Sequence, residues 1–156
     1  MTARLNIFKP APDAIGSWVA YSQKVAADGL EPGLVHLVTT RVSQLNGCAN
    51  CVNMHTREAR RDGESEQRLH LLSVWREAPV FSARERAALA WAEALTMIAV
   101  RGAPDDETYA AFAEHFSEEE QVKLTLRINA TSGWNRFAVG FRLFYEDRES
   151  ALADAA

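Results

Sequence analysis

Residues 34–60 read LVHLVTTRVSQLNGCANCVNMHTREAR, and this stretch decides the fold. Apolar side chains in its first half recur every three or four positions, which is the spacing of one face of an α-helix. They are Leu34, Val35, Val38, Val42 and Leu45. The Asn46-Gly47 pair is a turn signal and is expected to end that helix. The stretch therefore predicts two helices joined by a tight turn, and the second helix begins near Cys48.

Outside this stretch the same reasoning predicts helices over most of the chain. Two capping boxes, Ser82 to Glu85 and Ser117 to Glu120, mark helix starts, because each serine and glutamate can satisfy backbone N–H groups of a first turn. No segment shows sustained alternation of polar and apolar residues or a two-residue hairpin turn. The predicted helices cover about 13–27, 32–45, 48–63, 65–75, 82–98, 105–116 and 117–144. We therefore predict an all-α fold of six or seven helices.

The length and composition are those of one ordinary globular domain. With 156 residues, of which 47% are hydrophobic, the chain can bury one core but is too short for two. We expect the domain to span residues 1–150 and the alanine-rich residues 151–156 to form a frayed tail. A net charge of -4 disfavours binding to the phosphate backbone of nucleic acids.

Neither a membrane span nor a disulfide framework is predicted. The longest apolar run, Ala87 to Ala92, is far shorter than the roughly 20 residues of a membrane-spanning helix, and the first residues lack the apolar centre of a signal peptide. The expectation is a cytoplasmic protein that binds neither membranes nor nucleic acids. In a reducing compartment, two cysteines three residues apart add little stability, because so short a loop removes little entropy from the unfolded chain. We therefore expect the cysteines to have a chemical role.

Cys48, Cys51 and His55 form the one dense chemical motif. On a helix, side chains three and four positions apart project from one face, so the three residues share a stripe. The Asn46-Gly47 turn places both thiols in the first helical turn, where unpaired N–H groups and the helix dipole favour a thiolate. A cysteine pair at this spacing can attack a peroxide or a disulfide and then close on itself. The motif therefore favours redox chemistry.

Two other interpretations of the motif stay open. In the first, the cysteines are small buried apolar residues and His55 is a hydrogen-bonded core histidine. In the second, zinc is bound by Cys48, Cys51, His55 and His36. Structural zinc ligands usually come from a knuckle and a separate element, and a chain with this apolar content has no need of a metal to fold. We therefore expect no metal and no cofactor.

The predicted turn gives His36 a role as well. His36 lies ten positions before Asn46 and His55 lies nine after it, so the two histidines sit at nearly equal heights on adjacent antiparallel helices. We expect them to face each other and to relay protons. The alternative is that His36 is a surface histidine on the polar side of its helix.

The same stretch resembles a known family. Residues 34–60 are similar to the alkylhydroperoxidase D-like (AhpD-like) branch of the carboxymuconolactone decarboxylase superfamily, whose signature is Glu, eleven residues, Cys-x-x-Cys, three residues, His. The resemblance covers most of the chain and continues in the segments EQRL (66–69), WREAP (75–79), ERAALAW (85–91) and WNR (134–136). It implies an all-helical homo-oligomer, a trimer or a hexamer, whose cysteine pair reduces a hydroperoxide substrate. The implied electron donor is a dithiol protein reductant of the lipoyl or thioredoxin type.

By this resemblance, Cys51 is the peroxide-attacking thiol, Cys48 is the resolving thiol and His55 relays protons. The chain departs from the signature at His36, which stands where the family carries glutamate. Asn50 stands where the best-known peroxidases of the family carry a second histidine. The residues alone leave the order of the cysteines open, because Cys48 is nearer the helix start whereas Cys51 has a histidine one turn away. Decarboxylase members usually lack the cysteine pair, which makes lactone decarboxylation the less favoured activity.

The sequence thus predicts a thiol-dependent hydroperoxide reductase with an antioxidant role. The alternative is a slowly reacting redox sensor or interaction protein, because His36 replaces the relay carboxylate. Self-association is also expected, since a small helical layer does not readily cover all the aromatic residues that its helices present. These are Trp18, Trp75, Trp91, Trp134, Phe137, Phe141 and Phe144.

Overall fold

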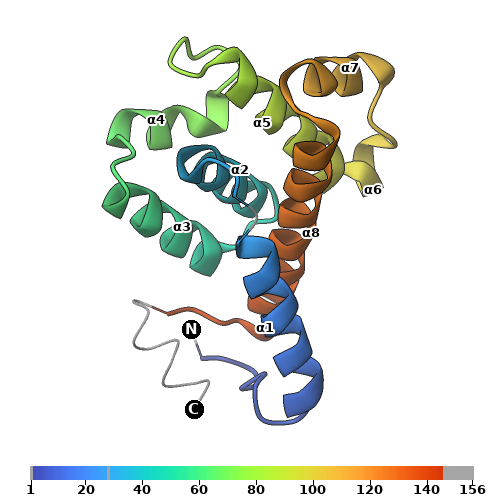
Figure 1. Ribbon diagram of the computed structural model, residues 1–156. Helices are drawn as coiled ribbons and strands as arrows, with labels where there is room; N and C mark the ends of the chain where they lie inside the picture. Colours follow the sequence, from blue (N-terminus) through green and yellow to red (C-terminus); the bar gives the residue numbers. More distant parts are fainter. Residues whose placement is uncertain (1, 28, 146–156) are drawn as a thin grey trace.

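The computed structural model describes residues 2–27 and 29–145, and within them it contains eight α-helices, one 3-10 helix and no strand. The elements are α1 Pro12–Ala26, α2 Pro32–Leu45, α3 Ala49–Arg61, α4 Glu66–Leu71, the 3-10 helix Leu72–Val74, α5 Ala83–Thr96, α6 Ile98–Arg101, α7 Asp106–His115 and α8 Glu118–Phe141 (Figure 1). The all-α prediction is confirmed. The predicted tail, 151–156, lies outside the described residues. None of the helices in the described ranges is long and apolar enough to cross a membrane.

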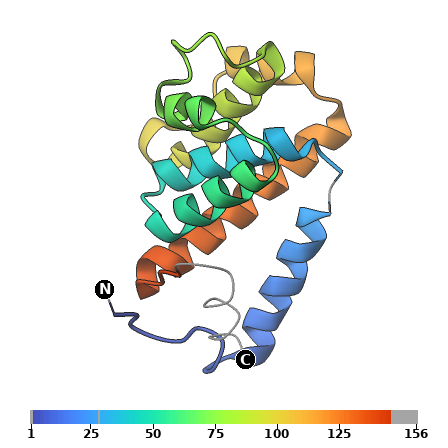
Figure 2. The ribbon, with the colours of Figure 1, turned by 90° about the vertical axis from the view of Figure 1, so that its left-hand side faces the viewer.

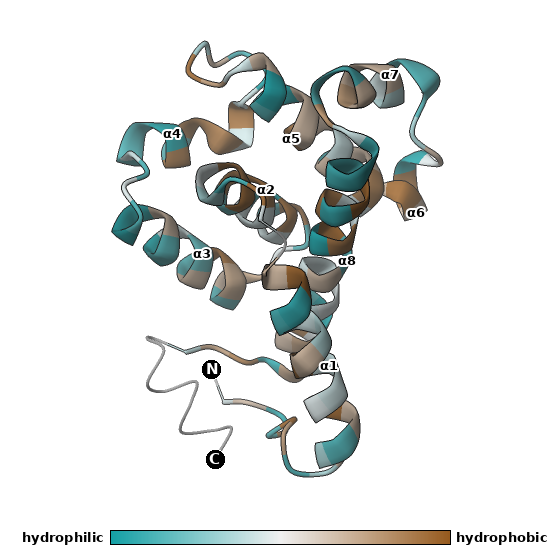
Figure 3. Cartoon of the chain, in the orientation of Figure 1, coloured by the Kyte–Doolittle hydropathy of each residue, from teal (hydrophilic) through white to brown (hydrophobic). Residues whose placement is uncertain are grey.

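Helix α2 lies at the centre of the fold, and α3, α5 and α8 pack around it (Figure 1). Val38 and Val42 on one side of α2 belong to a buried cluster with residues of α5, α7 and α8, including Phe112. Leu37 belongs to a second cluster, which includes Leu72 of the 3-10 helix. Much of α3 carries hydrophilic residues, which are teal in Figure 3. Because full burial of one such apolar side chain contributes about 1.5–3 kcal/mol, α2 holds the bundle together.

A buried carboxylate fixes α5 against α2. The side chain of Glu93 accepts hydrogen bonds from Arg41 Nε of α2 at 2.7 Å, from Trp75 Nε1 at 2.9 Å and from Arg76. Burial alone raises the pKa of a carboxyl group, but these donors outweigh it and hold the pKa of Glu93 below its ordinary value. The group is therefore a fully paired anion inside the fold.

Helix α1 lies outside this group and packs on α8 (Figure 2). The ring of Trp18 rests on Gly133, where a methyl group would lie 2.5 Å from the nearest ring atom. The same ring packs against Trp134 and Phe137, with centroid distances of 5.9 and 6.5 Å. The missing side chain at Gly133 therefore lets the two helices approach closely.

All seven predicted helices are present, and the differences lie at their ends. The helix predicted over 82–98 ends at Thr96, and after a break at Met97 the four residues Ile98–Arg101 form α6, which was not predicted and brings the number of α-helices in the described residues to eight. Helix α1, predicted over about 13–27, begins at Pro12, with Ala11 as its N-cap and Asp13 in its first turn. The capping boxes predicted at the starts of α5 and α8 are both formed.

The last helix ends before Phe144, to which the sequence extended it. Arg142 adopts a left-handed backbone conformation with φ 56°, and the N–H of Leu143 turns back to the Ala138 carbonyl at 2.9 Å. The N–H of Arg142 also donates to the Val139 carbonyl, at 3.4 Å. The two bonds form the Schellman motif that closes many helices. The chain after Phe141 therefore leaves the helix axis and runs past α3.

The contact between Trp18 and Gly133 generates a stability prediction. Gly133→Ala is expected to lower the free energy of unfolding by about 1 kcal/mol or more, because overpacking outweighs the helix propensity gained from alanine. Gly140→Ala in the same helix meets no atom within 4 Å and serves as the control, with an expected gain of a few tenths of a kcal/mol. Urea unfolding of both variants measures the difference. Equal stabilisation by the two alanines would contradict the close approach.

Candidate active site

The turn between α2 and α3 places the cysteines. Asn46 is the C-cap of α2, and Gly47 has φ 66°, a conformation that glycine adopts without steric cost. The N–H of Cys48 donates to the Ser43 carbonyl at 3.0 Å, which closes the turn. Cys48 is therefore the N-cap of α3, and the turn predicted at Asn46-Gly47 is confirmed.

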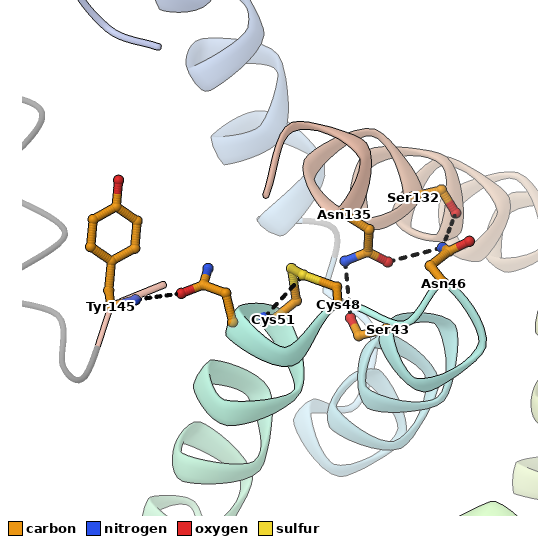
Figure 4. Close-up of a disulfide and its surroundings, with 8 residues drawn as sticks. Ser43, Asn46, Cys48, Cys51, Ser132, Asn135 and Tyr145 are labelled. Atoms are coloured by element: carbon orange, nitrogen blue, oxygen red, sulfur yellow. Dashed lines mark hydrogen bonds between the residues drawn. A yellow bond between two sulfur atoms is a disulfide. The ribbon is translucent and has the colours of Figure 1, made fainter. Parts of the chain in front are cut away.

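Cys48 and Cys51 form a disulfide, with their Cα atoms 5.3 Å apart (Figure 4). The N–H of Cys51 donates to Cys48 Sγ at 3.2 Å, so this sulfur serves as the cap of the helix. A helix N-terminus favours negative charge, which stabilises a thiolate at this position once the disulfide is reduced. The first turn of α3 thus combines a redox bond with an environment suited to its reduced, ionised form.

The two cysteines are buried, and one of them borders a pocket. Cys48 is 1% exposed and Cys51 is 3% exposed, and both belong to an apolar cluster that includes Ile7, Ile15 and Leu143. Cys48 lines a pocket of 590 Å³ between the α2–α3 turn, the end of α8 and the segment after it. Cys48 is therefore the half of the disulfide that adjoins this pocket.

A buried polar group beneath the turn holds it against α8. Asn135 is 1% exposed, donates from Nδ2 to Ser43 Oγ at 3.1 Å and accepts from Asn46 Nδ2 at 2.9 Å (Figure 4). Asn46 also lies 3.4 Å from the hydroxyl of Ser132. Sequence reasoning singled out Asn135 only as part of the WNR segment, and its partners are too far away in the sequence for spacing to find them.

The segment after α8 is tied to α3 by two hydrogen bonds. The N–H of Tyr145 donates to Asn50 Oδ1 at 2.8 Å, and the carbonyl of Tyr145 accepts from Asn53 Nδ2 at 3.2 Å. Figure 4 shows the first of these bonds beside the disulfide. Asn50 stands where the best-known peroxidases of the family carry a second histidine. Here it anchors the segment after α8 from a position between the two cysteines.

Each predicted relay histidine has a carboxylate partner on α3 or at its end. His55 Nδ1 lies 3.5 Å from Glu58 Oε2, one turn further along α3. His36 Nε2 lies 2.8 Å from Asp62 Oδ2, the C-cap of α3. No hydrogen bond joins the two histidines directly in the described part of the chain. Sequence reasoning missed both acids, although the spacing of three between His55 and Glu58 is a signal that predicts the contact.

Both imidazoles lower the pKa of Glu58. Hydrogen bonding with His55 lowers the pKa of Glu58 below its ordinary value, against the opposing effect of burial, and the charge of His36 adds to the lowering. Glu58 therefore stays ionised at and above neutral pH. Among the described residues, no group of three or more histidine, cysteine and acidic side chains has the arrangement of a metal site.

The comparison with known families agrees with this geometry. The model of the carboxymuconolactone decarboxylase family matches residues 12–94, which is more than half of the chain and includes both cysteines. The chain belongs to this family, in its AhpD-like branch. The matched residues of the family model run from α1 to α5, so they contain the turn, the disulfide, His36 and His55.

Relatives within the family match over most of the length. The uncharacterised protein YdfG of Bacillus subtilis is 37% identical over 139 residues, which cover 89% of this chain and 94% of the relative. A crystal structure from Agrobacterium tumefaciens, of a protein of unknown function described as a candidate antioxidant defence protein AhpD, has a TM-score of 0.88 and 46% identity over 94% of this chain and 100% of that chain. The debrominase Bmp8 shares the fold, with a TM-score of 0.78 and 19% identity over 93% of this chain and 78% of that one.

Proposed function

We propose that the protein is a thiol-dependent reductase of organic hydroperoxides with an antioxidant role. The observation that carries the proposal is the Cys48–Cys51 disulfide at the N-terminus of α3, on the wall of a pocket. Membership of the AhpD-like branch supports it, as does the description of the Agrobacterium tumefaciens relative as a candidate antioxidant defence protein.

The oxidative half of the cycle consumes one peroxide and both thiols. The Cys51 thiolate attacks the outer oxygen of the peroxide, the O–O bond breaks, and the leaving alkoxide takes a proton to become an alcohol. Cys51 is then a sulfenic acid. The Cys48 thiol attacks its sulfur, forms the disulfide and releases water.

The reductive half of the cycle uses an external dithiol. A thiolate of a lipoyl or thioredoxin-type protein attacks Cys48, the sulfur that lines the pocket, and releases the Cys51 thiolate. The second thiol of the donor then displaces Cys48 and leaves the donor oxidised. Because Cys51 is released beside the histidine one turn away, the thiolate is ready for the next peroxide.

The histidines move the protons of this cycle. His55 takes the proton of the Cys51 thiol and returns it to the leaving alkoxide, while Glu58 orients the imidazole through Nδ1. His36, hydrogen-bonded to Asp62, supplies the outer end of the relay, from which protons pass to solvent. Glu58 acts through His55 and is a positioning residue.

Turnover tests the proposed function. Reduced protein mixed with alkyl hydroperoxides is expected to form the disulfide at least about 10²-fold faster than free cysteine reacts, because a positioned acid and base contribute that much. A lipoyl or thioredoxin-type reductant is expected to sustain repeated cycles. Oxidation no faster than that of free cysteine would favour the redox sensor instead.

The same reaction assigns the two cysteines. With a sulfenic-acid trap present, Cys48→Ser protein is expected to give a labelled Cys51 after one equivalent of peroxide, whereas Cys51→Ser protein is expected to give no label. The reverse pattern would make Cys48 the attacking thiol.

The relay generates a prediction about pH. His55→Gln is expected to slow disulfide formation by roughly 10²-fold. Glu58→Gln is expected to slow it less, because the amide still contacts the imidazole but no longer supplies the negative charge that stabilises the imidazolium formed when His55 takes the proton. The lowered pKa of Glu58 keeps it charged from pH 5 to 9, so the effect of Glu58→Gln on the rate is expected to be the same across this range.

The control for this series is Glu119→Gln, which removes an exposed carboxylate paired with Lys123 on α8. His36→Gln keeps a polar group beside Asp62 and is expected to slow the reaction by less than His55→Gln does. A Glu58→Gln profile that superimposes on the wild type from pH 5 to 9 would remove the positioning role.

We further propose that copies of the chain associate in solution. Trp18, Phe137 and Phe141 line an apolar groove of 460 Å³ between α1 and α8, and Val122 and Val139 of α8 are exposed. Exposed apolar surface of this kind is typical of subunit contacts. Light scattering at micromolar concentration is expected to give a multiple of the 17.3 kDa chain, and the mass of a single chain would contradict the proposal.

A further inference from the structure

The pocket beside the disulfide is lined mainly by small and apolar residues. The end of α8 and the segment after it contribute four apolar residues to the lining, Ala138, Val139, Leu143 and Phe144. The volume of the pocket, 590 Å³, falls in the range of about 300–1,000 Å³ that is typical of sites for small organic ligands. The pocket therefore has room for much more than hydrogen peroxide.

One cation lines this pocket. Arg142 is the single charged residue of the lining, is exposed at the rim, and has no ion pair with any of the residues that the structure describes. It also has the left-handed backbone conformation that ends α8, at a position where helices usually carry glycine. That conformation costs a residue with a side chain about 1–2 kcal/mol, so backbone geometry does not explain an arginine here.

We propose that this pocket binds organic hydroperoxides that carry an apolar chain and an anionic head group such as a carboxylate, with the anion paired to Arg142. The inference rests on the proposed function and names its substrate class. The apolar walls remove the chain of the substrate from water, and the guanidinium can hold a carboxylate through two parallel hydrogen bonds. The peroxide group then lies at the Cys48 end of the pocket, next to the reacting sulfurs.

The overall charge gives a local cation a role in binding such a substrate. The chain carries a net charge of -4, which repels anions at long range. An arginine at the rim reverses this effect locally and selects the acid form of a substrate over its neutral ester. Because Arg142 is exposed, salt screens the attraction, and the selectivity falls as ionic strength rises.

The test compares linoleic acid hydroperoxide with its methyl ester as oxidants of the reduced protein, with loss of free thiols as the readout. The acid is expected to react up to about fivefold faster than the ester at low salt, since about fivefold is the upper end of the effect of one exposed ion pair. The acid-to-ester ratio is expected to fall towards one in Arg142→Gln and at high salt, and to be retained largely in Arg142→Lys. Arg101→Gln, which removes an exposed arginine from α6, is the control and is expected to keep the wild-type ratio.

The outcomes separate this inference from the proposed function. If neither compound nor tert-butyl hydroperoxide oxidises the reduced protein faster than free cysteine, the proposed function fails. If all three oxidise it but the acid and its ester react at equal rates, the reductase stands and the anion site is overturned. A ratio that falls equally in Arg101→Gln and Arg142→Gln would also overturn it, because the effect would then come from net charge alone.

Discussion

The position of the redox pair depends on one hydrogen-bonded group, in which Ser43, Asn46 and Asn135 join the end of α2 to α8. Asn135 is buried and uses both ends of its amide, so each partner avoids the roughly 1–3 kcal/mol that an unpaired buried polar group costs. Because Asn46 caps α2 and Cys48, the N-cap of α3, follows two residues later, the group fixes the turn between the two helices. The wall that α8 contributes to the pocket is held in register with the disulfide by the same bonds.

Sequence alone predicts the features of this fold that arise from neighbouring residues. The capping boxes of α5 and α8, the turn at Gly47 and the shared stripe of the cysteines all depend on spacings of four residues or fewer. The contacts of Asn135 join residues 89 and 92 positions apart and depend on how α2 packs on α8. The pocket wall also escaped prediction, since the left-handed Arg142 gives no signal in a sequence that otherwise continues the helix.

The packing of α2 against α3 explains how the protein can carry His36 where the family signature has glutamate. The family signature places a carboxylate on the helix before the cysteines, whereas here the acids near the two histidines, Glu58 and Asp62, belong to α3 and its C-cap. Negative charge thus stays next to the imidazoles although it comes from the other helix of the pair. The substitution redistributes the charges between two packed helices and leaves both histidines with an acidic neighbour.

The segments that cover the disulfide come from opposite ends of the described chain. Ile7 and Ile15 pack on it from one end, and Leu143 packs on it from the other, while the Arg4 N–H donates to the Phe141 carbonyl. During synthesis on the ribosome the cysteines and the first helix emerge long before residues 138–145. The two cysteines therefore lack their apolar cover until the last of these residues is made. Their burial needs segments from both ends of the described chain, so it is among the last steps by which the fold closes.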